Sequence, residues 1–184
     1  NIIETLYTDE RHLVVLAPEG ELLRKNRDLF LSQNASNTFA GYALSQLKRI
    51  KTHKKWIDGV PDPVKDPKGH KQYKIWKKNR NPVRAAIEEK HGYDCKHAMH
   101  LVRLMRMGRE VLTEGRVEVY RSDREELLAI RNGSWSYEHL VEWAENQKAE
   151  LFAIVDEGRA VVPEKPDYDK IVEIVEEVYS LAWK

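Results

Sequence analysis

The sequence contains a single cysteine, Cys95, which excludes an internal disulfide and fits a reducing compartment. Long apolar runs are also missing, so no segment has the pattern of a membrane-spanning helix. The first residues carry the acidic Glu4 and Asp9 in place of the apolar core of a secretory signal. These absences predict a cytoplasmic protein without a membrane partner. Cys95 itself is predicted to be a small buried residue and not a nucleophile.

The remaining composition, 41% hydrophobic and 33% charged over 184 residues, is typical of a globular chain with a real core. The net charge of +1 conceals a strong asymmetry. Residues 48–84 contain 13 Lys and Arg against three Asp, a local net charge of +10. Residues 110–184 contain nine Lys and Arg against 18 Asp and Glu, a net charge of −9. A concentrated basic stretch raises local affinity for polyanions even in a nearly neutral molecule.

Apolar periodicity predicts a mainly α-helical, bundle-like fold with one or two short β-strands. The strand candidates are Leu13–Leu16 and Arg116–Tyr120, and Ser122 with Glu125 has the spacing of a capping box that starts a helix. Predicted helices begin at Pro18 and cover about 38–55, 72–78, 82–91, 95–112, 123–132, 137–157 and 167–182. The sequence divides into a helical segment 1–56, a basic Pro- and Gly-containing loop or insertion 57–80, and a helical region 81–184.

The most informative segment is residues 92–106, GYDCKHAMHLVRLMR, because it combines a helix start with clustered cations and imidazoles. Asp94 can cap this helix by accepting from its first free N–H groups, after Gly92 has ended the preceding helix. Apolar residues recur at three- and four-residue spacing and predict a buried face: Ala98, Leu101, Val102, Met105 and Leu112.

Cations recur on another side of the same helix. Lys96, His100 and Arg103 share one face, and His97 lies in the first turn, near the positive end of the helix dipole. A helix start with free N–H donors and added cations favours phosphate. The same spacing is also typical of a solvated cationic surface, so the pattern permits a phosphate site without requiring one.

Aromatic residues are interleaved with lysines in the basic stretch. Aromatic faces among cations can stack bases while the cations hold phosphates. The residues predicted to contact nucleic acid in this way are Lys54, Lys55, Lys74, Trp76, Lys77 and Lys78. In the alternative interpretation, Trp56 and Trp76 anchor a surface segment to the core and the lysines keep it soluble.

Two further patterns give weaker hypotheses. Cys95, His97 and His100 resemble a metal set, but a second Cys pair and a His-Glu-x-x-His sequence are missing, so no metal ligand is predicted. Arg84 and His91 are separated by six residues, a spacing that resembles helical ribonucleases. There the His would act as general base while the Arg stabilises phosphate charge. The ribonuclease stays a minor alternative.

Residues 92–108, together with 128–137 (LAIRNGSWSY), resemble the C-terminal half of the predicted nucleotidyltransferases of the DNA polymerase beta superfamily. The similar members form a bacterial and phage group that includes RNA-repair-associated proteins, and residues 1–4 and 39–51 match as well. The resemblance implies transfer of a nucleoside monophosphate from a nucleoside triphosphate to an acceptor such as RNA or DNA. The family chemistry uses Mg²⁺ ions held by carboxylates.

The family's Gly-Ser turn and Asp-x-Asp carboxylates lie on strands that precede the segment matching Asn1. The Gly133-Ser134 dipeptide is followed by Trp135 and not by acids. We therefore expect a fragment that follows a missing α/β catalytic core, or a chain that needs a partner polypeptide. Mg²⁺ and the triphosphate are implied for the full-length enzyme, and this chain alone is predicted to hold neither a metal nor a catalytic residue.

By resemblance, the residues expected to contact the triphosphate are Lys96, His97, His100 and Arg103. The rival hypothesis is a non-catalytic helical module that binds RNA or a protein partner. A polyanion binder should lose affinity steeply with salt, whereas a nucleotide pocket should show competition by a specific triphosphate.

Overall fold

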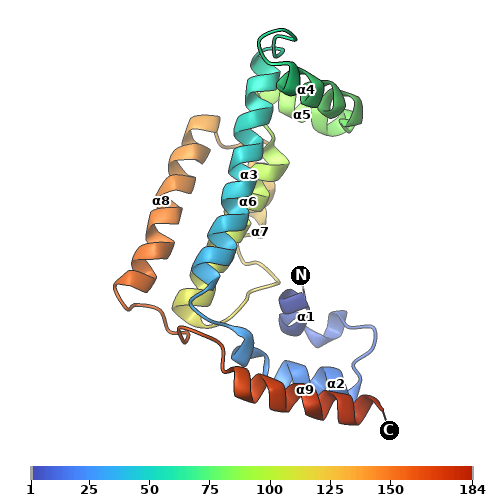
Figure 1. Ribbon diagram of the computed structural model, residues 1–184, viewed down its shortest axis with the longest axis vertical. Helices are drawn as coiled ribbons and strands as arrows, with labels where there is room; N and C mark the ends of the chain where they lie inside the picture. The colour runs from blue at the N-terminus through green and yellow to red at the C-terminus, as the bar shows by residue number, and fades with distance from the viewer. Residues whose placement is uncertain (1, 184) are drawn as a thin grey trace. The chain divides into compact units, whose positions relative to one another are not determined.

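The computed structural model describes residues 2–183, and these residues are mainly α-helical, without a β-strand (Figure 1). The helices are α1 (Ile2–Tyr7), α2 (Pro18–Lys25), α3 (Ala35–Asp58), α4 (Pro67–Asn79), α5 (Pro82–His91), α6 (Cys95–Glu114), α7 (Arg124–Arg131), α8 (Tyr137–Asp156) and α9 (Tyr168–Ala182). Two 3-10 turns, Glu10–His12 and Arg27–Phe30, flank α2. No helix in the described part of the chain is apolar over a stretch long enough to cross a membrane.

The prediction of one or two β-strands was wrong. Leu13–Leu16 and Arg116–Tyr120 are irregular, because a strand needs a neighbour for its N–H and C=O groups and residues 2–183 offer neither segment a strand partner. Val14 is fully exposed and Val15 is 80% exposed, so this apolar run does not pack as an edge strand. The capping box at Ser122 was also wrong: Asp123 occupies the N-cap position of α7 and makes no side-chain cap.

The chain forms two compact units, each built from separated segments. Unit 1 comprises residues 1–40, 106–122 and 149–184, and unit 2 comprises residues 41–105 and 123–148. The division predicted at residues 56 and 80 describes stretches of sequence and stays a prediction.

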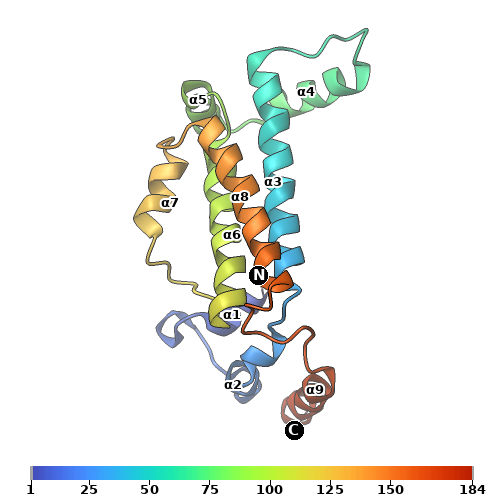
Figure 2. The same cartoon turned by 90° about the vertical axis from the view of Figure 1, so that its left-hand side faces the viewer.

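In unit 2, α3 lies alongside α6 and α8 (Figures 1 and 2). The ion pair between Lys51 Nζ and Glu145 Oε1, at 3.5 Å, joins α3 to α8. The buried side chains of this unit include Ala43, Leu47, Ile50, Tyr93, Ala98, Leu101, Val102, Met105, Ile130, Leu140 and Ala144. The predicted apolar stripe of α6 is therefore confirmed as a buried face, and Leu112 continues it within unit 1.

In unit 1, α2 packs against α9, and α1 packs against α2 (Figure 2). The C-terminal segment is held to the rest of the unit by backbone hydrogen bonds. The Gln33 N–H donates to Pro163 O at 2.8 Å, and the Val161 N–H donates to Leu112 O at 2.8 Å. Gly108 on α6 allows close packing, because a Cβ there would lie 2.8 Å from Phe39 Cβ.

The basic segment 57–80 contains more helix than predicted. Asp66 accepts a hydrogen bond from Gly69 N at 2.8 Å and starts α4, which then extends to Asn79 instead of covering only residues 72–78. Residues 59–66 form the remaining loop. Asn81 caps α5 by accepting from Arg84 N at 3.2 Å, so this helix begins at residue 82 as predicted. Gly92 ends α5 with a φ of +74°.

Candidate anion-binding site

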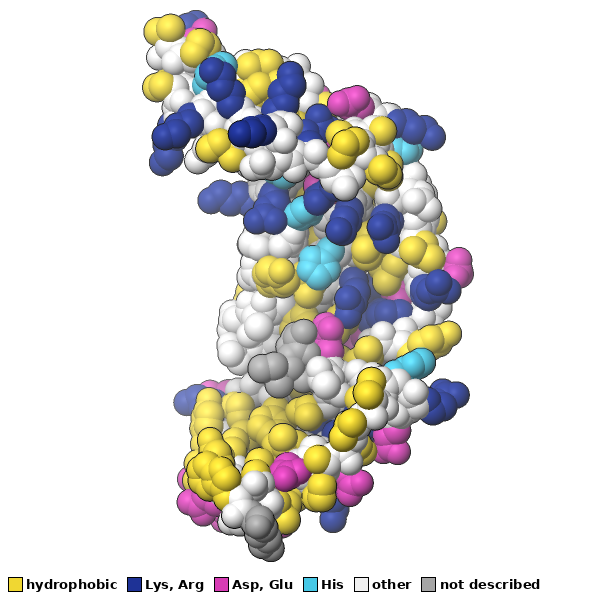
Figure 3. Space-filling view, turned by 90° about the vertical axis from the view of Figure 1, so that its right-hand side faces the viewer, with side chains coloured by type: hydrophobic (Ala, Val, Ile, Leu, Met, Phe, Trp, Pro, Cys, Tyr) yellow, Lys and Arg dark blue, Asp and Glu magenta, His cyan; other side chains and the backbone are white. Residues whose placement is uncertain are grey.

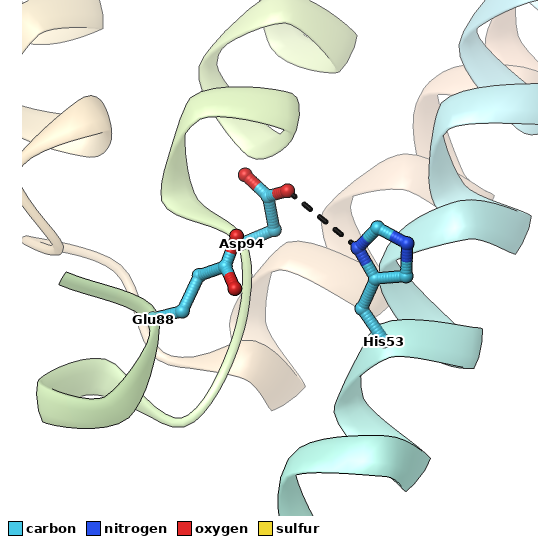
Figure 4. Close-up of side chains that lie close together, drawn as sticks. All are labelled: His53, Glu88 and Asp94. Atoms are coloured by element: carbon cyan, nitrogen blue, oxygen red, sulfur yellow. Dashed lines mark ion pairs between the residues drawn. The ribbon is translucent and has the colours of Figure 1, made fainter. Parts of the chain in front are cut away.

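The junction of α5 and α6 is built around Asp94, whose side chain is buried. Its Oδ1 accepts from His97 N at 3.0 Å, so the predicted cap of α6 is present. Its Oδ2 is bound by Arg84 Nη2 and lies 2.9 Å from His97 Nδ1. His53 Nδ1 from α3 approaches the same oxygen at 3.7 Å (Figure 4). Burial alone would raise the pKa of Asp94, but His53, His97 and Arg84 outweigh it and hold this pKa well below its usual range.

A second carboxylate, Glu88 on α5, is also buried, with 3% exposure. Its Oε2 accepts from Arg80 Nη2 at 2.9 Å, and its Oε1 lies 3.3 Å from Arg84 Nε. Burial and the charge of Asp94 raise the pKa of Glu88, while Arg80 and Arg84 oppose that rise. Two buried acids and two arginines thus form one connected network, in which Arg84 bridges both carboxylates.

A cavity of about 540 Å³ opens beside this network, and we call it the arginine cavity. It is lined by Arg49, His53, Trp76, Asn79, Arg80, Asn81, Arg84, Ala85, Glu88 and His97. Among the described residues, the buried side-chain polar atoms that lack a hydrogen-bond partner are His53 Nδ1, Arg80 Nε and Arg84 Nε. All three belong to residues that line the arginine cavity. Two of these atoms face a carboxylate without hydrogen-bond geometry: His53 Nδ1 lies 3.7 Å from Asp94 Oδ2, and Arg84 Nε lies 3.3 Å from Glu88 Oε1. Buried polar groups are normally hydrogen-bonded, so the groups beside this cavity are incompletely satisfied.

The charge of the lining also favours an anion. Three arginines line the cavity, and Glu88 is the one carboxylate among its lining residues. Arg49 Nη1 lies 3.2 Å from His97 Nε2, and the Arg80 guanidinium lies 4.5 Å from the ring centroid of Trp76. Figure 3 shows Lys and Arg side chains gathered around His side chains over the part of unit 2 formed by α3, α4 and α5. A phosphate oxygen would meet several N–H donors here at once.

The structure brings together only part of the phosphate-binding set predicted on α6. His97 lines the arginine cavity. Lys96 is exposed and lines a neighbouring cavity of about 250 Å³, together with Arg84 and Arg131. The rings of His100 and Tyr42 meet edge to face at 5.7 Å, and Arg103 is half-buried. His100 and Arg103 line neither cavity.

The predicted nucleic-acid residues are distributed over α3 and α4. Lys54 pairs with Asp58 at 2.6 Å, and Lys55 lines a depression that also contains Glu145. Lys77 lies over the ring of Tyr73, at 5.8 Å. Lys74 and Lys78 are exposed on α4, whereas Trp76 lines the arginine cavity. Of this set, Trp76 is the residue placed at the candidate site.

Sequence reasoning missed Arg49, His53 and Arg80 as members of the site. A signal was present, because Arg49 and His53 are four residues apart and therefore share one face of α3. Arg84 and Glu88 have the same spacing on α5 and form an i,i+4 ion pair. Such pairs are common on solvated helices, so the spacing alone could not separate a site from a surface.

A metal ion fits this network poorly. His53, Glu88 and Asp94 place their ligand atoms within 4.8 Å of one another. Each carboxylate is already bound by Arg84, so a dication would have to displace a guanidinium. The same pairing argues against a catalytic Mg²⁺, which requires free oxygen ligands.

Cys95 is buried as predicted, and burial raises the pKa of its thiol to about 11.

Unit 1 has a cavity of about 720 Å³ that is less suited to an anion. Its lining includes three arginines, Arg24, Arg27 and Arg116, against four acids, Asp9, Asp28, Glu114 and Glu118. No described buried side chain in it has an orphaned polar atom. The balance of charge makes it the weaker candidate.

Arg84 and His91, the pair of the ribonuclease hypothesis, both lie on α5, and that hypothesis stays a prediction. Arg84 lines the arginine cavity, while the ring of His91 lies against the turn at Gly133, about 2.3 Å from where a Cβ on Gly133 would stand.

No protein-family model matches the chain, and comparisons with curated proteins and with solved structures found no match either.

Proposed function

We propose that this chain is the helical part of a nucleotidyltransferase and that its arginine cavity binds the phosphates of a nucleoside triphosphate. The observation that carries the proposal is a cavity lined by three arginines, two of which, Arg80 and Arg84, are held by buried carboxylates. The sequence resemblance of residues 92–108 to such enzymes supports it independently.

Phosphate suits this lining for chemical reasons. Guanidinium groups bind phosphate oxygens through paired N–H donors, and such charge-assisted hydrogen bonds are about twice as strong as neutral ones. An anion in the cavity would accept from guanidinium N–H groups that Glu88 and Asp94 do not engage, and hydrogen bonds to charged groups contribute about 1.5–3 kcal/mol each. Glu88 and Asp94 hold these arginines in place before the ligand arrives.

In this proposal the chain binds and orients the nucleotide and does not carry the reacting acids. Nucleotidyl transfer attacks the α-phosphorus and releases pyrophosphate, with metal ions neutralising the charge. Both buried acids of the site are engaged by arginines, so carboxylates other than Glu88 and Asp94 would hold the metal. The arginine cavity would bind the triphosphate, and the RNA or DNA acceptor would reach it from outside.

Isothermal titration of the whole chain with each nucleoside triphosphate tests the proposal. Arg49→Ala removes an exposed cation of the cavity lining. We expect it to weaken triphosphate binding at least about tenfold, because one charged hydrogen bond to the ligand is lost. Lys90→Ala, an exposed cation on α5 outside the cavity, is the matched control.

A second comparison separates the structural site from the set predicted on α6. The double variant Lys96→Ala, Arg103→Ala should weaken binding less than Arg49→Ala, because neither of its residues lines the arginine cavity. A triphosphate affinity that Arg49→Ala leaves unchanged would refute the proposed site. Inorganic triphosphate is the companion probe, because it isolates recognition of the phosphates from that of the base.

A further inference from the structure

A second cavity, of about 530 Å³, lies between α3 and α4, and we call it the aromatic groove. It is lined by Ser45, Lys48, Arg49, Thr52, His53, Trp56, Gln72, Ile75 and Trp76. Its volume is within the range of about 300–1,000 Å³ that small ligands occupy. Arg49, His53 and Trp76 line both this groove and the arginine cavity, so the two hollows are neighbours in unit 2.

The wall of the groove is an aromatic cluster. The ring centroids of Trp56 and Trp76 lie 5.3 Å apart, and the His53 ring lies 5.5 Å from Trp56 and 5.3 Å from Trp76. Both indoles are half-buried, so each is packed and also reaches the cavity. Indole rings that line an open groove are the groups on which nucleobases stack.

The rest of the lining suits a nucleotide chain. Lys48 and Arg49 supply two cations, and no carboxylate lines the groove. Gln72 is exposed on α4, and its amide can donate to and accept from the edge of a base. Ile75 adds an apolar surface that is 53% exposed. Stacking surface, cations and an amide recur in sites that bind single strands.

We propose that the aromatic groove binds a nucleobase of a single-stranded nucleic acid, the acceptor, next to the phosphate site. The inference rests on the proposed function for the role of the neighbouring arginine cavity. A single strand is favoured over a duplex because a base must leave its stack to lie against Trp56 and Trp76. Arg49, shared by both cavities, would contact the phosphates between the two sites.

The test uses the whole chain and a fluorescein-labelled single-stranded oligouridylate of about 12 nucleotides, a length within the usual range of such sites. Trp56 lines the groove and not the arginine cavity, so Trp56→Leu removes the stacking surface, while the leucine keeps an apolar side chain against His53 and Trp76. We expect it to weaken oligonucleotide binding about tenfold and to leave triphosphate binding unchanged. Trp183→Leu, which alters an indole that is 81% exposed just after α9, is the matched control.

A second variant avoids any loss of packing. Ile75→Glu places a negative charge in the groove at an exposed position and should weaken oligonucleotide binding, whereas the neutral Ile75→Gln should not. Lys48→Ala should reduce the slope of log K against log salt by about 0.7, the value for one phosphate contact on a single strand. The matching duplex should bind more weakly than the single strand.

The outcomes separate this inference from the proposed function. Oligonucleotide binding that Trp56→Leu and Ile75→Glu leave unchanged overturns the groove assignment, even where Arg49→Ala weakens triphosphate binding. Equal weakening of triphosphate and oligonucleotide by Trp56→Leu also overturns it, because the groove then holds the base of the donor nucleotide. Binding of the oligonucleotide that depends on Trp56, without any triphosphate binding, supports the groove and refutes the proposed function.

Discussion

The ion-pair network at Asp94 can be tested by the single substitution Asp94→Asn. Asparagine keeps the shape of the side chain and an oxygen that can cap α6, so the hydrogen bond from His97 N is retained. The variant removes the negative charge that faces Arg84 and His97. Its effect on stability therefore measures the charge and not the cap.

The expected magnitude follows from the burial of the pair. Removing one partner of a buried ion pair costs about 3–5 kcal/mol, because the remaining charge stays buried without compensation. Arg84 keeps Glu88 as a neighbour at 3.3 Å, so the lower end, about 3 kcal/mol, applies to Asp94→Asn. Asp94→Ala also loses the cap, which adds about 1 kcal/mol. The difference between the two variants isolates the contribution of the cap.

Urea unfolding followed by tryptophan fluorescence is the assay. Unit 2 contains four of the five tryptophans, Trp56, Trp76, Trp135 and Trp143, so the signal reports mainly on the unit that holds Asp94. With a slope of about 2 kcal/mol per molar urea, a loss of 3 kcal/mol lowers the midpoint by about 1.5 M. Trp183 in unit 1 contributes the remaining signal.

The pH dependence gives an independent check with a definite sign. The pKa of Asp94 is lowered in the folded state, so its contribution to stability is fully present above the unfolded value of about 3.9 and is lost as pH falls below it. The wild type and Asp94→Asn should differ by a constant amount from about pH 5 to 7 and converge at lower pH. Equal stability at pH 7, or a difference that persists unchanged to pH 3, would refute the ion-pair account.

Four further predictions concern packing and titration. Gly41→Ala, in α3 with no atom within 4 Å of the new Cβ, should raise stability by about 0.5–1 kcal/mol. Gly108→Ala puts its Cβ 2.8 Å from Phe39 and should lower stability by about 1–3 kcal/mol, so opposite shifts in urea midpoint are expected. Cys95, with a pKa raised to about 11, should react with a thiol reagent at pH 8 only as urea unfolds the chain, and rapid native labelling would contradict its burial. Glu88 has a raised pKa, so its unfavourable contribution grows as pH rises from about 4.3. The stability of Glu88→Gln relative to wild type should therefore increase toward pH 7, and a flat difference in urea midpoint would count against this reasoning.

Most helix positions could be predicted from the sequence because helix starts depend on local chemistry. Asn81, Asp94, Ser136 and Asp167 each accept a hydrogen bond from a backbone N–H three residues later, and residues of these types favour helix starts. The strand at 116–120 failed because pairing in a sheet is not local. An alternating pattern needs a neighbouring strand, which residues 2–183 do not provide.

The site could be predicted only in part, for a geometric reason. Successive residues on a helix differ by about 100° in direction, so Lys96 and His97 face different cavities although they are adjacent in sequence. His97 was predicted from its place in the first turn of α6. Arg49 and His53 come from α3 and meet it through the packing of α3 against α6, which no local pattern encodes.

The arrangement at Arg84 explains why the site suits an anion despite its two buried acids. Glu88 and Asp94 bind different nitrogens of the same guanidinium, and together with Arg80 they form a network with little freedom to move. Donors that are already oriented require no reorganisation when charge arrives. The guanidinium groups of Arg80 and Arg84, which line the cavity, are therefore held in fixed orientations by the two acids. Glu88 and Asp94 thus neutralise much of the positive charge of Arg80 and Arg84 but keep the N–H groups of these arginines in fixed directions. Directional donors, more than net charge, distinguish a phosphate site from a basic surface.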